Sequence, residues 1–147
     1  MLAIIQTIVN GFREVHQTFE QLIREAPEAS LDWQPAPNTN SLAVLITHTL
    51  GSERQMWHLV TNSPYQRDRS EEFLIRHASK EELLQLLAAA NATIEQLAPR
   101  LSEDALTTTH QRSDGRAQTG LEWLITNYGH AREHLDQAQI TQQLFPS

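Results

Sequence analysis

Apolar residues recur every three or four positions along four long stretches of this 147-residue chain. This spacing places them on one face of an α-helix, because a helix completes a turn in about 3.6 residues. The first stretch covers residues 2–24 and carries Ile5, Ile8, Val9, Phe12, Val15, Phe19, Leu22 and Ile23. The others cover residues 42–60, 80–97 and 120–143. Four amphipathic helices without a strand signal predict an all-α fold, a four-helix bundle.

Capping and breaking residues mark the ends of these stretches. Ser41 is suited to cap the second helix, because its hydroxyl can accept a hydrogen bond from the first helical turn. Ser79 and Thr119 each precede a glutamate by three residues, the spacing of a capping box at a helix start. Pro27 and Pro99 follow the first and third helices and end them.

The connections between the helices carry weaker signals. Residues 27–40 are rich in proline, serine and asparagine and predict an irregular segment. Residues 67–77 are charged and predict a short extra helical turn around Phe73. Residues 101–118 are polar, with no sustained period of either kind. We expect residues 1–147 to form a single domain, since a chain of this length buries roughly two-thirds of its unfolded surface around one core.

Composition excludes several classes of function. The chain has no cysteine, so any metal ion must be bound through histidine, carboxylates or solvent. Its formal charge of −7 is spread without a basic cluster, which argues against nucleic acid as a partner. No apolar run approaches the roughly 20 residues that span a bilayer, and the start lacks the features of a signal peptide. We therefore expect a cytoplasmic protein without a membrane partner.

Histidine spacing in the last helix points to a metal site. His130 and His134 are four residues apart, a turn of about 400°, so both imidazoles lie on one helix face about 6 Å apart along the axis. His48, in the middle of the second helix, can complete a group of three if the two helices face each other. Three imidazoles leave coordination positions for water or substrate, and they accept zinc, nickel, iron or manganese. Such a divalent ion could activate water or polarise a substrate.

Neighbouring side chains are candidates to orient these histidines or to line a pocket beside them. Asn127 and Gln137 share the histidine stripe of the last helix, while Glu53 and Trp57 follow His48 on the second. No local motif identifies a catalytic acid, base or nucleophile, so the catalytic residues stay unassigned. We expect the other four histidines to lie on solvated faces or to make local hydrogen bonds: His16, His58, His77 and His110.

The order of these features resembles the DinB-like superfamily, which includes YfiT-type metal-dependent hydrolases and bacillithiol- and mycothiol-dependent transferases. The resemblance covers essentially the whole chain. It is carried by Leu31-Asp32-Trp33-Gln34-Pro35, by Ser41-Leu42-Ala43-Val44-Leu45-Ile46-Thr47-His48, and by Trp123-Leu124 leading into His130-x-x-x-His134-x-x-Gln137. It implies that His48, His130 and His134 bind one divalent ion near one end of the bundle, and that the chain forms a homodimer.

The resemblance implies less about the reaction. It favours a transferase that uses a small-molecule thiol, or a hydrolase, with the ion activating the thiol or water. The alternative is a non-catalytic metal-binding protein or a dimeric structural bundle. The sequence shows no arginine-rich segment for an anionic low-molecular-weight thiol, and the nearest basic residue, Arg132, is expected to point outward.

Overall fold

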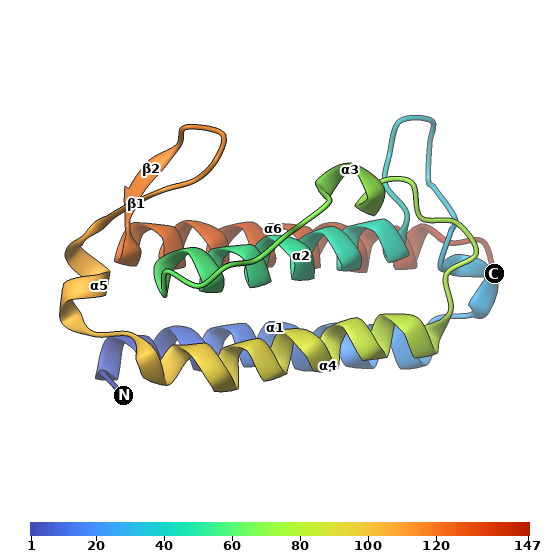
Figure 1. The fold of residues 1–147 in the computed structure, drawn as a ribbon. Coiled ribbons are helices and arrows are strands. Elements are labelled where there is room, and N and C mark those ends of the chain that lie inside the picture. Colours follow the sequence, from blue (N-terminus) through green and yellow to red (C-terminus); the bar gives the residue numbers. More distant parts are fainter.

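Four long helices form the body of the computed structural model, which describes residues 1–147. They are α1 (Ala3–Glu25), α2 (Leu42–Val60), α4 (Lys80–Leu97) and α6 (Gly120–Leu144). Figure 1 shows α1 and α4 in one layer and α2 and α6 in the other. Helices α2 and α1 each pack against both α4 and α6. The predicted all-α four-helix bundle is confirmed.

Short elements occupy the connections. They are η1 (Glu28–Ser30), α3 (Arg69–Glu72), η2 (Ala98–Arg100), α5 (Glu103–Thr107), and the strands β1 (Thr109–Gln111) and β2 (Ala117–Thr119). The connection from α2 to α4 returns along α2, so α2 and α4 run in the same direction (Figure 1). It carries α3 back to α2, where Glu72 of α3 contacts His48. The predicted helical turn in residues 67–77 is confirmed as α3.

The capping hydrogen bonds predicted for the side chains of Ser41, Ser79 and Thr119 form in the structure. Ser41 and Ser79 accept hydrogen bonds from Val44 and Glu82 backbone amides, at 3.2 and 3.1 Å. At Thr119 both halves of the capping box form, because Glu122 also accepts a hydrogen bond from the Thr119 amide. No helix combines the length and apolar character that a membrane span requires.

Residues 101–118, which show no sustained period in the sequence, contain short elements that the sequence did not predict. Here β1 and β2 pair antiparallel in register Thr109 with Thr119, directly before α6. The turn is closed by the Arg112 amide donating to the Arg116 carbonyl at 2.8 Å, with Gly115 at φ +91°. Three-residue strands are too short to show an alternating pattern, but the Asp114-Gly115 pair is a hairpin signal that could have revealed them.

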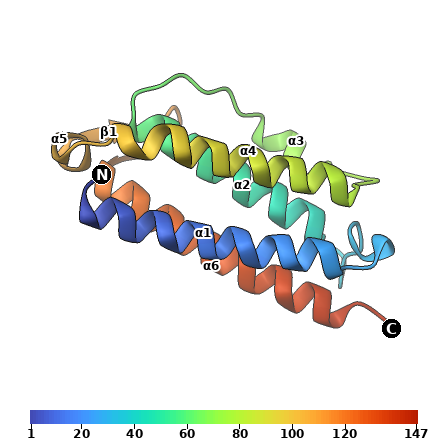
Figure 2. The same cartoon turned by 90° about the horizontal axis from the view of Figure 1, so that it is seen from below.

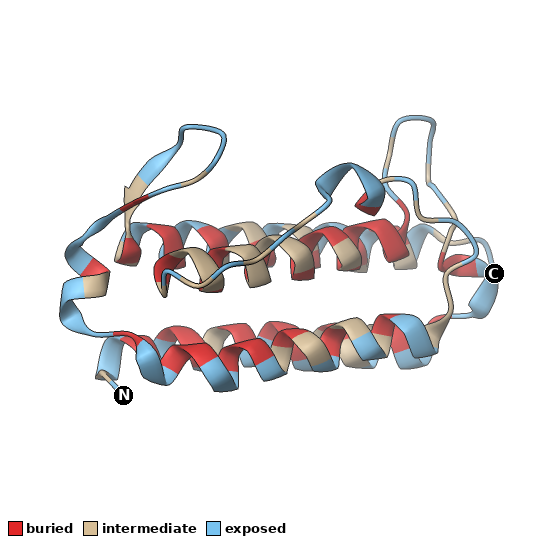
Figure 3. Ribbon diagram, in the orientation of Figure 1, coloured by how far each residue is buried: buried red, intermediate tan, exposed pale blue.

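The bundle core lies between the two layers, where the buried faces of the helices meet (Figure 3). Phe12 of α1 packs edge-on against Trp57 of α2 and Tyr128 of α6, at ring-centroid distances of 5.8 and 5.5 Å. Gly11 permits this approach, because a Cβ there would lie 2.8 Å from the Tyr128 ring. Figure 2, seen from below, shows α1 crossing in front of α6. The core thereby fixes α6, and its histidines, against α2.

Candidate metal centre

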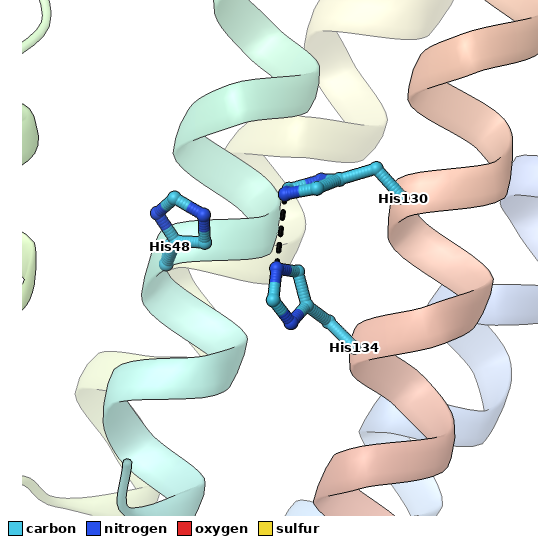
Figure 4. A group of neighbouring side chains, drawn as sticks. All are labelled: His48, His130 and His134. Carbon is cyan, nitrogen blue, oxygen red and sulfur yellow. Dashed lines mark hydrogen bonds between the residues drawn. The ribbon is translucent and has the colours of Figure 1, made fainter. Parts of the chain in front are cut away.

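Three imidazoles converge between α2 and α6. His48 comes from α2, and His130 and His134 come from successive turns of α6 (Figure 4). Their potential ligand nitrogens all lie within 4.8 Å of one another. The ring centroids of His48 lie 5.2 Å from His130 and 5.1 Å from His134. The structure thus brings together the three histidines that the sequence spacing selected.

His48 is held in place by the α3 segment. Its Nδ1 lies 3.2 Å from Glu72 Oε1 and 3.2 Å from Arg67 Nη2, and donation from Nδ1 to the carboxylate leaves Nε2 with a free lone pair. Arg67 donates two hydrogen bonds to the same carboxylate, from Nε at 2.9 Å and from Nη2 at 2.7 Å. Its Nη1 donates to Gln55 at 2.9 Å. A hydrogen bond from a carboxylate to the remote ring nitrogen fixes the tautomer and orientation of a metal-binding histidine.

Glu72 is ionised in this arrangement. Its carboxylate is about nine-tenths buried, and burial acts to raise its pKa. Hydrogen bonds from His48 and Arg67, together with the Arg67 charge, outweigh burial and lower the pKa of Glu72 below its ordinary value. Gly51 makes room for the carboxylate, since a Cβ at that position would lie 2.0 Å from Glu72 Oε2. The ion pair therefore depends on a glycine at this position of α2.

The α6 histidines are arranged so that their Nε2 atoms face each other at 2.9 Å. His134 Nδ1 donates to Gln137 Oε1 at 2.8 Å, so the lone pair of His134 is on Nε2. The buried Nδ1 of His130 has no hydrogen-bond partner. Two facing ring nitrogens with lone pairs repel each other unless a proton or a cation lies between them.

Both α6 imidazoles are neutral at neutral pH. Burial, followed by the charges of His134, His48, Arg67 and Arg69, lowers the pKa of His130 to about 4. Burial also lowers the pKa of His134, although the Gln137 hydrogen bond partly offsets the effect. Metal ions bind neutral imidazole, so no proton has to be displaced from a charged ring at neutral pH. The donor set, its spacing and its protonation state fit a single divalent ion.

A cavity of about 380 Å³ opens beside the histidines. His48 and His130 lie on its wall, and it extends along α6 past Asn127 and Trp123 toward the β1–β2 hairpin. Trp123 is the one hydrophobic residue in the lining. This volume is in the range of small-molecule sites, although such sites are usually more apolar.

Of the four other residues predicted to lie at the site, two lie there and two do not. Asn127 lines the cavity and donates to Ser52 Oγ at 3.0 Å, and Gln137 bonds to His134. Glu53 and Trp57 do not lie at the site: both are fully buried in the bundle core. Glu53 follows His48 by five residues, a rotation of about 500° that turns its side chain about 140° away. Its hydrogen-bond partner is His16 of α1, at 2.8 Å.

The remaining histidines lie outside the triad. His58 and His110 make the expected local hydrogen bonds, to Ser63 Oγ and to the Ala105 carbonyl, and His77 is exposed. His16 is different, because it is buried between α1, α2 and α4. Its two ring nitrogens contact Asn91 Oδ1 at 2.6 Å and Glu53 Oε2 at 2.8 Å. The expectation of a solvated or locally bonded His16 is wrong.

Sequence reasoning missed several residues at the site. Glu72 and Arg67 are 24 and 19 positions from His48, and no local pattern connects them to it. Arg69, Arg112 and Arg116 also line the cavity, although the sequence showed no arginine-rich segment. They arrive from two separate connections, α3 and the hairpin, so only the folded chain brings them together.

Comparison with known proteins agrees with this architecture. The profile of the DinB superfamily matches residues 12–138, which include all three histidines. The chain belongs to the DinB superfamily. The matched range includes all of α2 and α4 and most of α1 and α6.

Solved structures share the fold. A conserved protein from Enterococcus faecalis superposes with a TM-score of 0.80 at 18% identity, covering 98% of each chain. A DinB-like protein from Bacillus cereus gives 0.75 at 15% identity, covering 94% of this chain and 90% of its own. The mycothiol-dependent maleylpyruvate isomerase gives 0.68 at 16% identity, and this chain covers 59% of its length. A search of functionally curated proteins found no match.

Proposed function

We propose that this DinB superfamily protein binds one divalent ion through His48, His130 and His134 and acts as a metal-dependent enzyme on a small molecule. The reaction proposed is transfer of a small-molecule thiol to an electrophile, or hydrolysis. One observation carries the proposal: three imidazoles from two helices converge beside a polar cavity. Zinc, nickel, iron and manganese all suit such ligands.

The residues around the site have distinct tasks in this proposal. When bound, a divalent ion supplies a Lewis acid that lowers the pKa of a thiol or of water. Glu72 and Gln137 hold the Nδ1 hydrogens of His48 and His134, so both Nε2 lone pairs stay directed into the site. Asn127, anchored on Ser52, shapes the adjacent cavity wall. The similarity in fold to a mycothiol-dependent isomerase supports a thiol as cosubstrate.

The second candidate is a non-catalytic metal-binding or structural bundle. A structural ion is usually closed off by a fourth protein ligand, whereas a catalytic one keeps an open position. The group of potential ligands here contains three histidines and no fourth histidine, cysteine or carboxylate. An incomplete ligand set that borders a cavity favours the enzyme over the structural bundle.

Activity assays on metal-loaded protein test the proposal. Bacillithiol, mycothiol and cysteine are each offered with an aryl chloride, so that a sulfur–carbon bond forms, chloride leaves and the thiol proton passes to buffer. Nitrophenyl esters test hydrolysis. We expect turnover that chelation removes, and that His134→Ala reduces by at least about a hundredfold, the scale of losing activation of the nucleophile.

His58→Gln is the matched control, because His58 lies outside the triad and bonds only to Ser63 through its side chain. It should retain the activity of the parent. Turnover that survives both chelation and His134→Ala would contradict metal-dependent catalysis. Failure of every thiol and ester with fully loaded protein would favour the non-catalytic alternative.

Two further features belong to the proposal. We infer a homodimer from the superfamily resemblance, and sedimentation equilibrium measures it; a single-chain mass of 16.7 kDa at all concentrations would contradict it. We also place the protein in the cytoplasm, which fractionation of expressing cells tests. The proposed partner is a small molecule rather than a nucleic acid or a membrane.

A further inference from the structure

Positive charge is concentrated in the cavity beside the histidines. Of the chain's ten arginines, four line this cavity: Arg67, Arg69, Arg112 and Arg116. Asp114 is the one carboxylate in the lining. The whole chain carries a formal charge of −7, so this local excess of cations is opposite to the charge of the protein. A concave site with one sign of charge attracts ligands of the other sign.

Two of the four arginines are already paired. Arg67 is held by both oxygens of Glu72, and its side chain is only 6% exposed. Arg112 forms two hydrogen bonds to Asp114 within the hairpin turn. These two guanidinium groups serve the structure of the cavity wall, and their charges are largely balanced.

Arg69 and Arg116 differ, because neither has a carboxylate partner. Both are exposed, and both are placed by aromatic rings instead: Arg69 lies 4.9 Å from the Phe73 ring centroid and Arg116 lies 5.4 Å from that of Trp123. Stacking on a ring positions a guanidinium and leaves its N–H edge free to bind an anion. Trp123 is itself fixed by its Nε1 donating to the His110 carbonyl at 2.9 Å.

The two free arginines bracket the cavity from different elements. Arg69 belongs to α3, whose Phe73 cap residue packs against His48 at 4.9 Å between ring centroids. Arg116 belongs to the hairpin and stacks on Trp123, which precedes His130 on α6 by seven residues, about 10 Å along the axis. Between these ends, the buried Asn127 Oδ1 has no partner and can accept a hydrogen bond. Arg116 thus lies toward the end of the cavity away from the histidines, whereas Arg69 lies toward His48.

We infer that this cavity binds a small organic anion that has a carboxylate or phosphate group held by Arg116 at the hairpin end, while its other end lies near Arg69, His48 and His130. This inference names the substrate class of the function proposed above and rests on it for the reaction. The anion binding itself depends only on the protein's own arginines. It can therefore be measured without any metal ion.

Nuclear magnetic resonance titration tests the inference on the full chain in the presence of chelator. The probe is the indole N–H signal of Trp123, assigned with Trp123→Phe, and the ligands are succinate, its neutral analogue succinamide, and inorganic phosphate. We expect succinate or phosphate to shift the signal saturably and succinamide to leave it unchanged. The difference between the two anions identifies whether the group preferred is a carboxylate or a phosphate.

The variant pair Arg69→Gln with Arg116→Gln should weaken anion binding by about tenfold or more, since each loses one charge-assisted contact. The matched control is Arg13→Gln with Arg132→Gln, which changes the net charge equally at two exposed arginines outside the cavity. It should bind like the parent. Equal weakening in both pairs, or no preference for the anions over succinamide, would overturn the inference.

Metal content measured in parallel separates this inference from the proposed function. Anion binding by a protein that takes up no metal would overturn the proposed function alone. Metal uptake without anion binding would overturn this inference alone.

Discussion

At the scale of single residues, the candidate site depends on side chains that act through others. Glu72 contacts both His48 and Arg67, and so couples a potential metal ligand to the segment that covers it. Its place is available only because Gly51 lacks a side chain. A glycine in the middle of a helix is normally unfavourable, so its presence in α2 has a structural cause.

The substitution Gly51→Ala tests this dependence. The new Cβ would overlap Glu72 Oε2, displace the carboxylate and release His48 from its orientation. We expect metal affinity to fall by roughly tenfold to a hundredfold, the usual effect of removing a group that orients a ligand. Gly129→Ala is the control, because a Cβ at Gly129 meets nothing within 4 Å. Competition titration measures both affinities, and parent-like binding by Gly51→Ala would contradict the role of Glu72.

The buried pair of His16 and Glu53 predicts a pH-dependent stability. Burial acts to lower the pKa of His16, but the hydrogen bond and charge of Glu53 outweigh it and raise the pKa above 6.5. Burial raises the pKa of Glu53 above 4.5, and His16 only partly offsets this. Both shifts mean that the folded protein binds more protons than the unfolded chain. The free energy of unfolding contributed by the pair is therefore greatest at low pH and falls as pH rises through the raised values.

Urea unfolding at several pH values between about 5 and 8 measures this loss, which cannot exceed about 1.4 kcal/mol per pH unit for one proton. In Glu53→Gln, His16 loses the partner that raises its pKa, so the decline with pH should flatten or reverse. Glu14→Gln removes an exposed carboxyl from α1 and should keep the parent's slope. An unchanged slope in Glu53→Gln would show that the pair does not hold the proton.

At the scale of elements, the long helices and the short α3 turn were predictable, and the β1–β2 hairpin was not. The start and end of α2 coincide with the predicted 42–60, because Ser41 caps it and the apolar period is sustained over five turns. The β1–β2 hairpin has only three residues in each strand, and its register depends on a turn around Gly115. Short elements of this kind are stabilised by tertiary contacts such as Trp123 with His110, which a local pattern does not record.

At the scale of the whole molecule, the cavity joins three separated parts of the chain. The histidines were predictable because helical spacing alone aligns His130 with His134, and a second helix offered His48. The arginines and Glu72 were not, because the path of the α2–α4 connection and the hairpin brings them to the site. Glu53 was misplaced for a different reason: it is near His48 in sequence, but five residues along a helix turn its side chain to another face, where it contacts His16.

Elemental analysis after exposure to zinc, nickel, iron and manganese ions tests the central claim most directly. The tag-free parent, the variant His130→Ala with His134→Ala, and the control His58→Gln with His77→Asn are desalted and compared. We predict about one divalent ion per chain in the parent and in the control, and little in the first variant. A parent that retains no ion, or a first variant that retains as much as the parent, would contradict a metal site formed by His48, His130 and His134.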